Sequence, residues 1–200
     1  MRCAWDAFIN LVPASIRREV DRLGKESLQE LRLRRGRATE LCMHGASKWL
    51  DYRATDQDIS FSVNAASRYS PWAAETASKG YITAPGGHRV GLCGVCSVRS
   101  GQVQGIRQPD SLCIRVARDF PGIGDGIPDG GSVLILGPPG TGKTTLLRDV
   151  IRSRSNKECA AVVDERGELF PGEADFLFGR RMDVLTGCGK SEGVEMALRT

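Results

Sequence analysis

Apolar and polar positions along the first 120 residues predict a mixture of short helices and paired strands. Residues 28–35 alternate, with Leu31 and Leu33 on one side and Arg32 and Arg34 on the other, which is typical of a half-buried strand. Turn residues separate the other segments. Helices are predicted at 13–23, 55–68 and from Ser70-Pro71 to Gly80, and strands at 41–43, 48–52, 81–83, 88–98 and 112–117.

The pattern changes after residue 120. Seven of the eleven residues at 121–131 are Gly or Pro, and such a segment cannot hold regular structure. The apolar run 132–136 then predicts a buried strand, followed by a helix with Leu146, Leu147, Val150 and Ile151 on one face, and a second strand at 159–163. We therefore expect an α+β N-terminal domain at 1–120, a hinge at 121–131 and an α/β domain at 132–200.

Between the strand at 132–136 and the helix lies a phosphate-binding loop, with the spacing G-x-x-x-x-G-K-[ST]. Its glycines allow backbone N–H groups to point at phosphates, and the helix N-terminus adds its positive dipole end. Lys143 would reach the β- and γ-phosphates, and the Thr144 hydroxyl would bind Mg²⁺. The predicted contacts to a nucleoside triphosphate are Gly137, Pro138, Pro139, Gly140, Thr141, Gly142, Lys143, Thr144 and Thr145.

Two acidic residues, Asp164 and Glu165, end the strand at 159–163. In such an enzyme one carboxylate can hold Mg²⁺, directly or through water, and the next can orient or deprotonate the attacking water. We predict that Asp164 contributes to the metal site and that Lys143, Asp164 and Glu165 are catalytic. The alternatives are that the two acids couple substrate binding to motion or only solvate the strand end. Candidates for sensing phosphate charge are Arg166, Arg180, Arg181 and Arg199.

Charge and composition add little to this. Residues 1–125 carry 18 Lys and Arg against 13 Asp and Glu, whereas residues 126–200 carry 10 against 11. The basic cluster at 32–37 could bind nucleic acid, but the solvated face of a strand is the favoured interpretation. No apolar run reaches the roughly 20 residues that cross a bilayer, and no signal peptide opens the chain, so we expect a cytoplasmic protein.

The cysteines and histidines suggest no further chemistry. Seven cysteines are expected to be free thiols. Cys93 and Cys96 could form half a zinc site or a redox pair, but no second ligand pair accompanies them, and two small residues in a glycine-rich strand are the preferred interpretation. His88 follows a turn and is left without a functional role.

Several sequence blocks in order along nearly the whole chain resemble the family of stage III sporulation protein AA. They are ELRLR from Glu30, GYITAPGGHRVGL from Gly80, SLCIRVAR from Ser111, GKTTLLRD from Gly142, VDER from Val163 and DVLTGCGK from Asp183. The resemblance implies an ATPase of endospore-forming bacteria, similar to the motor ATPases of type II and type IV secretion. Its expected fold is a P-loop NTPase domain of RecA-like, secretion-ATPase type, preceded by the α+β domain.

The same resemblance implies ATP and Mg²⁺ as ligands and a homohexamer in the mother-cell cytoplasm. The protein would be peripheral at the membrane and would contact membrane proteins of the channel between mother cell and forespore. Arg89, Arg115 and Arg118 of the N-terminal domain would approach the nucleotide, and residues 164–166 would form an acidic box. The roughly 70 residues after Gly131 supply only two or three strands, so we expect a domain truncated at its C-terminus, before the family's later acidic strand.

Two other functions stay open. One is a nucleic-acid-binding ATPase that uses the cluster at 32–37, although nucleic acid is an unlikely partner. The other is a nucleotide-binding scaffold that does not hydrolyse ATP.

Overall fold

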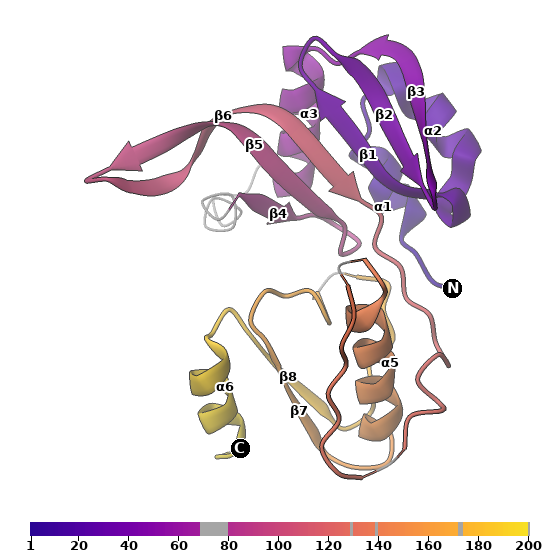
Figure 1. Ribbon diagram of the computed structural model, residues 1–200, viewed down its shortest axis with the longest axis vertical. Coiled ribbons are helices and arrows are strands. Elements are labelled where there is room, and N and C mark those ends of the chain that lie inside the picture. Colours follow the sequence, from indigo (N-terminus) through magenta and orange to yellow (C-terminus); the bar gives the residue numbers. More distant parts are fainter. Residues whose placement is uncertain (69–79, 129, 139, 172–173, 200) are drawn as a thin grey trace. The chain divides into compact units, whose positions relative to one another are not determined.

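The structure, a computed structural model, describes residues 1–68, 80–128, 130–138, 140–171 and 174–199. The chain forms two compact units (Figure 1). The first contains Ala4–Ala117, and the second contains Met1–Cys3 together with Arg118–Thr200. The division therefore falls between Ala117 and Arg118, and residues 121–131 belong to the second unit. Within that unit the Gly/Pro-rich segment is bonded to a helix, since the Gly124 N–H donates to the Asp149 carboxylate, and the hinge at 121–131 stays a prediction.

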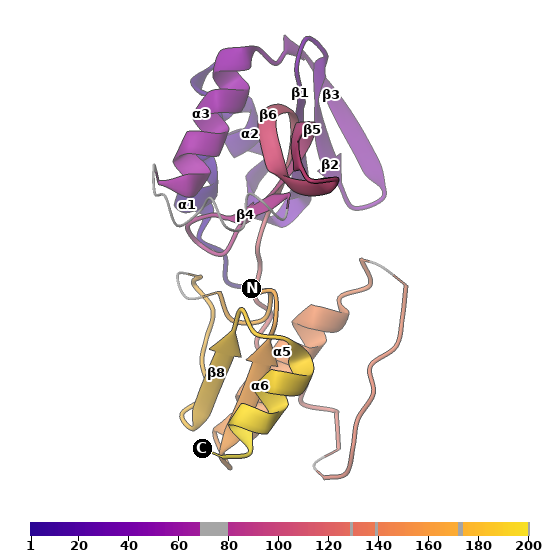
Figure 2. The same ribbon diagram turned by 90° about the vertical axis from the view of Figure 1, so that its left-hand side faces the viewer.

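The first unit is built on a six-stranded sheet with the order β3-β2-β1-β6-β5-β4, in which every neighbouring pair is antiparallel. Its strands are β1 (Leu28–Arg34), β2 (Ala38–Met43), β3 (Ala46–Arg53), β4 (Tyr81–Thr83), β5 (Arg89–Arg99) and β6 (Gln102–Arg115). Helices α1 (Trp5–Asn10), α2 (Ala14–Ser27) and α3 (Asp56–Ser67) lie on one face of it (Figure 2). The predicted α+β architecture is confirmed.

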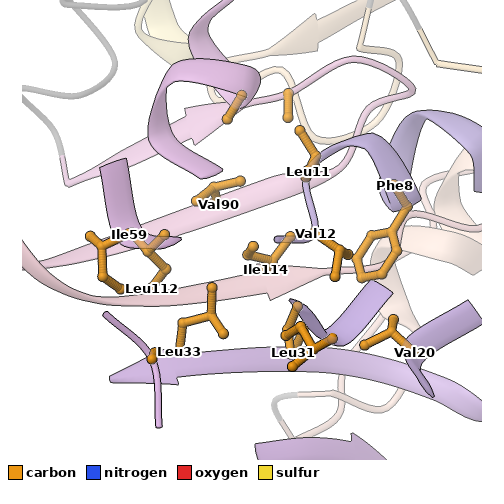
Figure 3. Close-up of a cluster of buried hydrophobic side chains, with 14 of the residues drawn as sticks. Phe8, Leu11, Val12, Val20, Leu31, Leu33, Ile59, Val90, Leu112 and Ile114 are labelled. Carbon is orange, nitrogen blue, oxygen red and sulfur yellow. The ribbon is translucent and has the colours of Figure 1, made fainter. Parts of the chain in front are cut away.

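Alternation along β1 decides which face of the sheet is buried. Leu31 and Leu33 are fully buried, while Arg32 lies on the opposite face. Leu31 pairs with Ile114 of β6, and Leu33 pairs with Leu112, so the apolar rows of the two central strands coincide. Figure 3 shows these side chains against the helices. The helices and the segment that follows α1 contribute Phe8, Leu11, Val12, Ile16, Val20 and Ile59 to this core.

The helix ends follow the predicted signals. Thr55 and Asp58 form a capping box at the start of α3: the Asp58 N–H donates to Thr55 Oγ1 over 3.2 Å, and the Thr55 N–H donates to Asp58 Oδ2 over 2.8 Å. Gly24 has a φ of +74° and interrupts the helical geometry of α2. The helix predicted from Ser70 falls on residues 69–79, outside the described residues. Among the described helices, none is long and apolar enough to cross a membrane.

The second unit is of α/β type, as predicted. Strands β7 (Ala160–Asp164) and β8 (Met182–Thr186) pair in parallel, with α5 (Lys143–Ser155) and α6 (Lys190–Ala197) on opposite faces of the pair (Figures 1 and 2). Val162 belongs to a buried cluster with Leu169 and Phe170, and Ile151 of α5 packs against this cluster. The next residue of β7, Val163, approaches Gly193 of α6 so closely that a Cβ on the glycine would lie 2.4 Å from a Val163 methyl carbon. Alternation along β7 therefore buries one valine against each helix.

The predicted buried strand at 132–136 is wrong in this structure. The segment has no strand geometry, and Val133, Leu134 and Leu136 are 48%, 81% and 80% exposed. An apolar run becomes a buried strand only where neighbouring strands supply hydrogen bonds and other layers cover its faces. In the described part of the chain, β7 and β8 pair with each other and leave residues 132–136 unpaired.

A buried histidine links the two ends of the first unit. His88 is fully buried, its Nε2 lies 2.9 Å from the Ala4 carbonyl oxygen, and its Nδ1 accepts a hydrogen bond from the Ala117 N–H over 3.0 Å. With Nδ1 as acceptor, Nε2 carries the proton and donates to Ala4, so the ring is neutral. His88 thus has a structural role, because the ring joins the first and last residues of the unit.

We predict that His88 makes the stability of the first unit depend on pH. Burial lowers the pKa of His88 below its ordinary value of 6.5. Between the folded and unfolded pKa values the unfolded chain binds more protons, so the stabilising contribution is complete above about pH 6.5 and is lost as the pH falls below it. Urea unfolding followed by tryptophan fluorescence at several pH values measures this slope.

The matched variants are His88→Gln and His44→Gln, which replace the two histidines of the chain one at a time. His88→Gln should flatten the slope below pH 6.5, whereas His44→Gln, at an exposed position, should keep it. An unchanged slope in His88→Gln would contradict the assignment.

Candidate nucleotide-binding site

The phosphate-binding loop depends on its glycines. Gly140 and Gly142 have φ values of +79° and +84°, in the left-handed region that favours glycine. A Cβ on Gly137 would lie 2.9 Å from Thr141 Oγ1, so this position also has no room for a side chain. Pro139 lies outside the described residues. The local backbone therefore favours glycine at 140 and 142, whereas at 137 it is the Thr141 side chain that leaves little space for a Cβ.

Helix α5 begins at Lys143, immediately after the loop. The Lys143 Nζ donates to the Pro138 carbonyl oxygen over 2.7 Å, and Thr141 Oγ1 donates to the same oxygen over 2.8 Å. The lysine side chain thus folds back over the loop, and its ammonium group is bonded to a backbone carbonyl of the same loop. Thr144 is exposed in the first turn of α5, where N–H groups lack partners within the helix. This arrangement offers an ammonium group, a hydroxyl and helix N–H groups to an anion.

The buried face of α5 differs from the predicted one. Leu147 is 39% exposed, whereas Arg148, Asp149 and Arg152 are only 5%, 2% and 6% exposed. Val150 is buried as expected. The helix thus places charged side chains in the interior, and burial of a charge is unfavourable unless the charge is paired and hydrogen-bonded.

These buried charges are paired with one another and with residues 119 and 124, which precede the phosphate loop in the chain. Arg152 forms an ion pair with Asp119, with 2.6 Å between NH1 and Oδ2, and a second ion pair with Asp149. Asp149 also accepts the Gly124 N–H over 2.6 Å. Residues 119 and 124 are therefore held against the helix that follows the phosphate loop.

Sequence reasoning missed this set of buried charges. The available signal was the consecutive pair Arg148-Asp149, which stands beside Val150 inside an otherwise apolar helical pattern. Without knowledge of Asp119, fully buried on a distant segment, such a pair is typical of a solvated helix face.

The two acids at the end of β7 have different surroundings. Asp164 is 4% exposed, and its carboxylate accepts N–H groups from Glu168, Leu169 and Phe170 over 2.9, 2.8 and 3.1 Å. Glu165 is exposed. Their catalytic and metal-binding roles stay predictions, and of the two side chains Glu165 is the one exposed to solvent. No group of three or more potential metal ligands among His, Cys, Asp and Glu occurs in the described residues.

The candidate arginines are dispersed over both units. Arg89 lies over the Tyr81 ring, 4.1 Å from its centroid, and the Arg115 Nε donates to Glu30 Oε2 over 3.1 Å. Arg181 donates to the Lys157 carbonyl oxygen over 3.2 Å. Arg166, Arg180 and Arg199 are exposed, and Arg118 is partly buried. The approach of any of these arginines to nucleotide stays a prediction.

Comparison with known proteins assigns the family. The model described as sporulation stage III, protein AA, matches residues 5–200. The chain belongs to this family. It is 35% identical over 209 residues to stage III sporulation protein AA of Bacillus subtilis (strain 168), an alignment that covers 95% of this chain and 68% of that protein. It is also 28% identical over 173 residues to protein SEEDLING PLASTID DEVELOPMENT 1 of Arabidopsis thaliana, covering 82% of this chain and 23% of that protein.

Solved structures show the same fold class. The pilus retraction motor PilT, solved with bound ADP, matches with a TM-score of 0.58 and 16% identity, and the Legionella pneumophila ATPase DotB matches with a TM-score of 0.51 and 18% identity. These alignments cover 92% and 94% of this chain. The sporulation protein therefore has the fold of P-loop secretion ATPases, and it spans 56% of the length of each of these two chains.

We predict that Arg152→Met lowers the free energy of unfolding of the second unit by about 3–5 kcal/mol, because it leaves Asp149 without its guanidinium partner and Asp119 with only the longer, 3.9 Å ion pair to Arg148. Hydrogen exchange of the α5 amides against urea concentration measures the change. The control Arg166→Met, in an exposed turn, should alter it by less than about 0.5 kcal/mol. Adding Asp119→Asn to Arg152→Met should recover part of the loss; equal losses in the single and double variants would contradict the pairing.

Proposed function

We propose that this chain binds ATP with Mg²⁺ and hydrolyses it to ADP and phosphate, as a motor protein of endospore formation. The observation that carries the proposal is the loop at 137–144, whose left-handed glycines lead directly into the N-terminus of α5 at Lys143. Membership of the sporulation family and the fold of secretion ATPases support it.

Nucleotide binding would use groups that the loop and the start of α5 already bring close together. The N–H groups at the start of α5 would donate to the phosphate oxygens. Lys143 would exchange its bond with the Pro138 carbonyl for the β- and γ-phosphates. The exposed Thr144 hydroxyl would hold Mg²⁺, which supplies charge neutralisation between the phosphates.

Hydrolysis needs a group that orients water for in-line attack on the γ-phosphorus. Glu165 is the candidate, since it is exposed directly after β7 and carries an acceptor for the proton of the water. As the new P–O bond forms, the bond to the ADP oxygen breaks, and Lys143 would stabilise the charge that develops on the phosphate oxygens.

We propose the role in the cell by analogy with structurally similar proteins whose chains are longer than this one. PilT is described as a pilus retraction motor. By analogy we propose a homo-oligomer, a hexamer, at the mother-cell membrane, which energises assembly of the channel to the forespore or transport through it. Membrane proteins of that channel would be its partners. A scaffold that binds nucleotide without hydrolysing it is the alternative within the same site.

The structure gives little support to a nucleic-acid-binding function. Arg34 forms an ion pair with Glu40 over 2.8 Å, and the Arg34 guanidinium lowers the pKa of that carboxyl. Arg35 forms ion pairs with Asp56 and Asp110. Arg32, another member of the cluster, likewise forms an ion pair with Glu30. Charges neutralised within the protein release few counterions from a nucleic acid.

We predict that Lys143→Ala weakens ATP binding by at least about 10-fold, because the phosphates lose a charge-assisted bond, and abolishes turnover. Titration with a fluorescent ATP analogue and a phosphate-release assay measure both quantities. Lys48→Ala, at an exposed position of β3, is the matched control and should behave as wild type. Undiminished turnover in Lys143→Ala would refute the assignment of the loop, and binding without any wild-type turnover would favour the scaffold.

We further predict that a single-stranded oligonucleotide binds weakly at low salt, with a shallow dependence of the binding constant on salt concentration. Isotherms at two salt concentrations measure this. A steep dependence that Arg37→Ala reduces would instead favour the nucleic-acid-binding ATPase.

A further inference from the structure

The turn that carries Glu165 is held by charged side chains from two different elements. From β7, the Asp164 carboxylate accepts the N–H groups of residues 168, 169 and 170. From α5, the Arg148 guanidinium donates to the carbonyl oxygens of Glu168 and Leu169, over 2.9 and 2.5 Å. An anion thus binds the N–H groups of this segment while a cation binds its carbonyl groups.

Both charged groups are shielded from water. Arg148 and Asp164 are 5% and 4% exposed, and the Phe176 ring lies 4.0 Å from the Arg148 guanidinium carbon. Hydrogen bonds to an ionised group are about twice as strong as neutral ones, and a low local dielectric strengthens them further. The segment 164–170 is therefore fixed to α5 rather than free to move with the exposed surface.

The position of Arg148 on α5 connects this segment to the phosphate loop. Arg148 follows Lys143 by five residues, or about 7.5 Å along the helix axis at 1.5 Å per residue. Glu165 follows Asp164 directly along the chain. A rigid helix, a guanidinium and a buried carboxylate thus set where the Glu165 backbone lies relative to Lys143.

We propose that Arg148 and Asp164 are positioning residues for ATP hydrolysis, which hold Glu165 in register with the phosphate-binding loop. The inference rests on the proposed function and replaces the metal-site role predicted for Asp164 from the sequence: Asp164 acts through the backbone of 168–170 and not as a ligand of Mg²⁺. Three of the roughly four acceptor positions of its carboxylate are already used by N–H groups.

Two conservative variants test the proposal while keeping the size of each side chain close to the original. Asp164→Asn keeps one acceptor oxygen and replaces the other with a donor that opposes the N–H groups. Arg148→Lys keeps the positive charge but cannot donate in the planar fork that reaches two carbonyls. The controls are Asp183→Asn, at an exposed position of β8, and Arg154→Lys, which donates to the Pro128 carbonyl from the same helix.

The first readout is hydrogen exchange of the 200-residue chain without nucleotide. Both variants should lose protection at the amides of residues 168–170, while the amides of β7 and the middle of α5 stay protected. The second readout is kinetic. We expect kcat to fall about 10- to 100-fold, the effect of displacing a catalytic group by roughly 1 Å, with the affinity for MgATP within about twofold of wild type.

The decisive comparison is made in a Glu165→Gln background. A residue that acts through Glu165 should lower kcat little further once Glu165 is replaced, so the two losses should not multiply. A merely structural role would reduce kcat by the same factor in both backgrounds, and that result would overturn the proposal. Wild-type kcat in Asp164→Asn, despite lost protection at 168–170, would overturn it as well.

Failure of the proposed function gives a different result. A wild-type chain that binds MgATP without turnover, or does not bind it, refutes hydrolysis and with it the catalytic purpose of the positioning. Measurable wild-type turnover with unaffected variants refutes the positioning alone.

Discussion

The second unit depends on pairing the charges that helix α5 carries into the interior. Arg148, Asp149 and Arg152 are nearly inaccessible to water, and an unpaired charge at such a position would strongly destabilise the fold. Their partners are Asp119, backbone groups near residues 118 and 124, and the segment after β7. One helix therefore fixes both the segment 118–124 and the segment after β7, and it is the helix that starts at Lys143 of the G-x-x-x-x-G-K-[ST] motif.

This arrangement gives the candidate site its rigidity. The backbone shape of the loop comes from the left-handed conformations of Gly140 and Gly142, which glycine adopts without contacts from other parts of the fold. The acidic turn after β7 also contains a left-handed glycine, Gly167, but the segment that follows it is fixed by buried hydrogen bonds to Asp164 and Arg148. The backbone shape of the loop is thus a local property of a short segment, whereas the placement of Glu165 depends on contacts across the whole unit.

The first unit is stabilised by other means. Its six-stranded sheet buries one apolar face beneath three helices, and its open face carries ion pairs such as those of Glu30 with Arg32 and Arg115. Cross-strand pairing of leucine and isoleucine rows fixes the register, because a slip of one residue would turn every apolar side chain to the opposite face. His88 then joins the two ends of the unit through its two ring nitrogens.

Local patterns in the sequence determined most of the first unit and the phosphate loop. The alternation of β1, the capping box of Thr55 and the glycines of the loop express backbone preferences and side-chain periods of a few neighbouring residues, so they can be recognised without a structure. Tertiary structure decided the rest. An apolar run at 132–136 is a strand only if neighbouring strands pair with it, and Arg148 and Arg152 are buried only because Leu169 and Asp119 come from distant segments to bond them. Hydrogen bonding and charge pairing between remote residues leave no periodic signal in the chain.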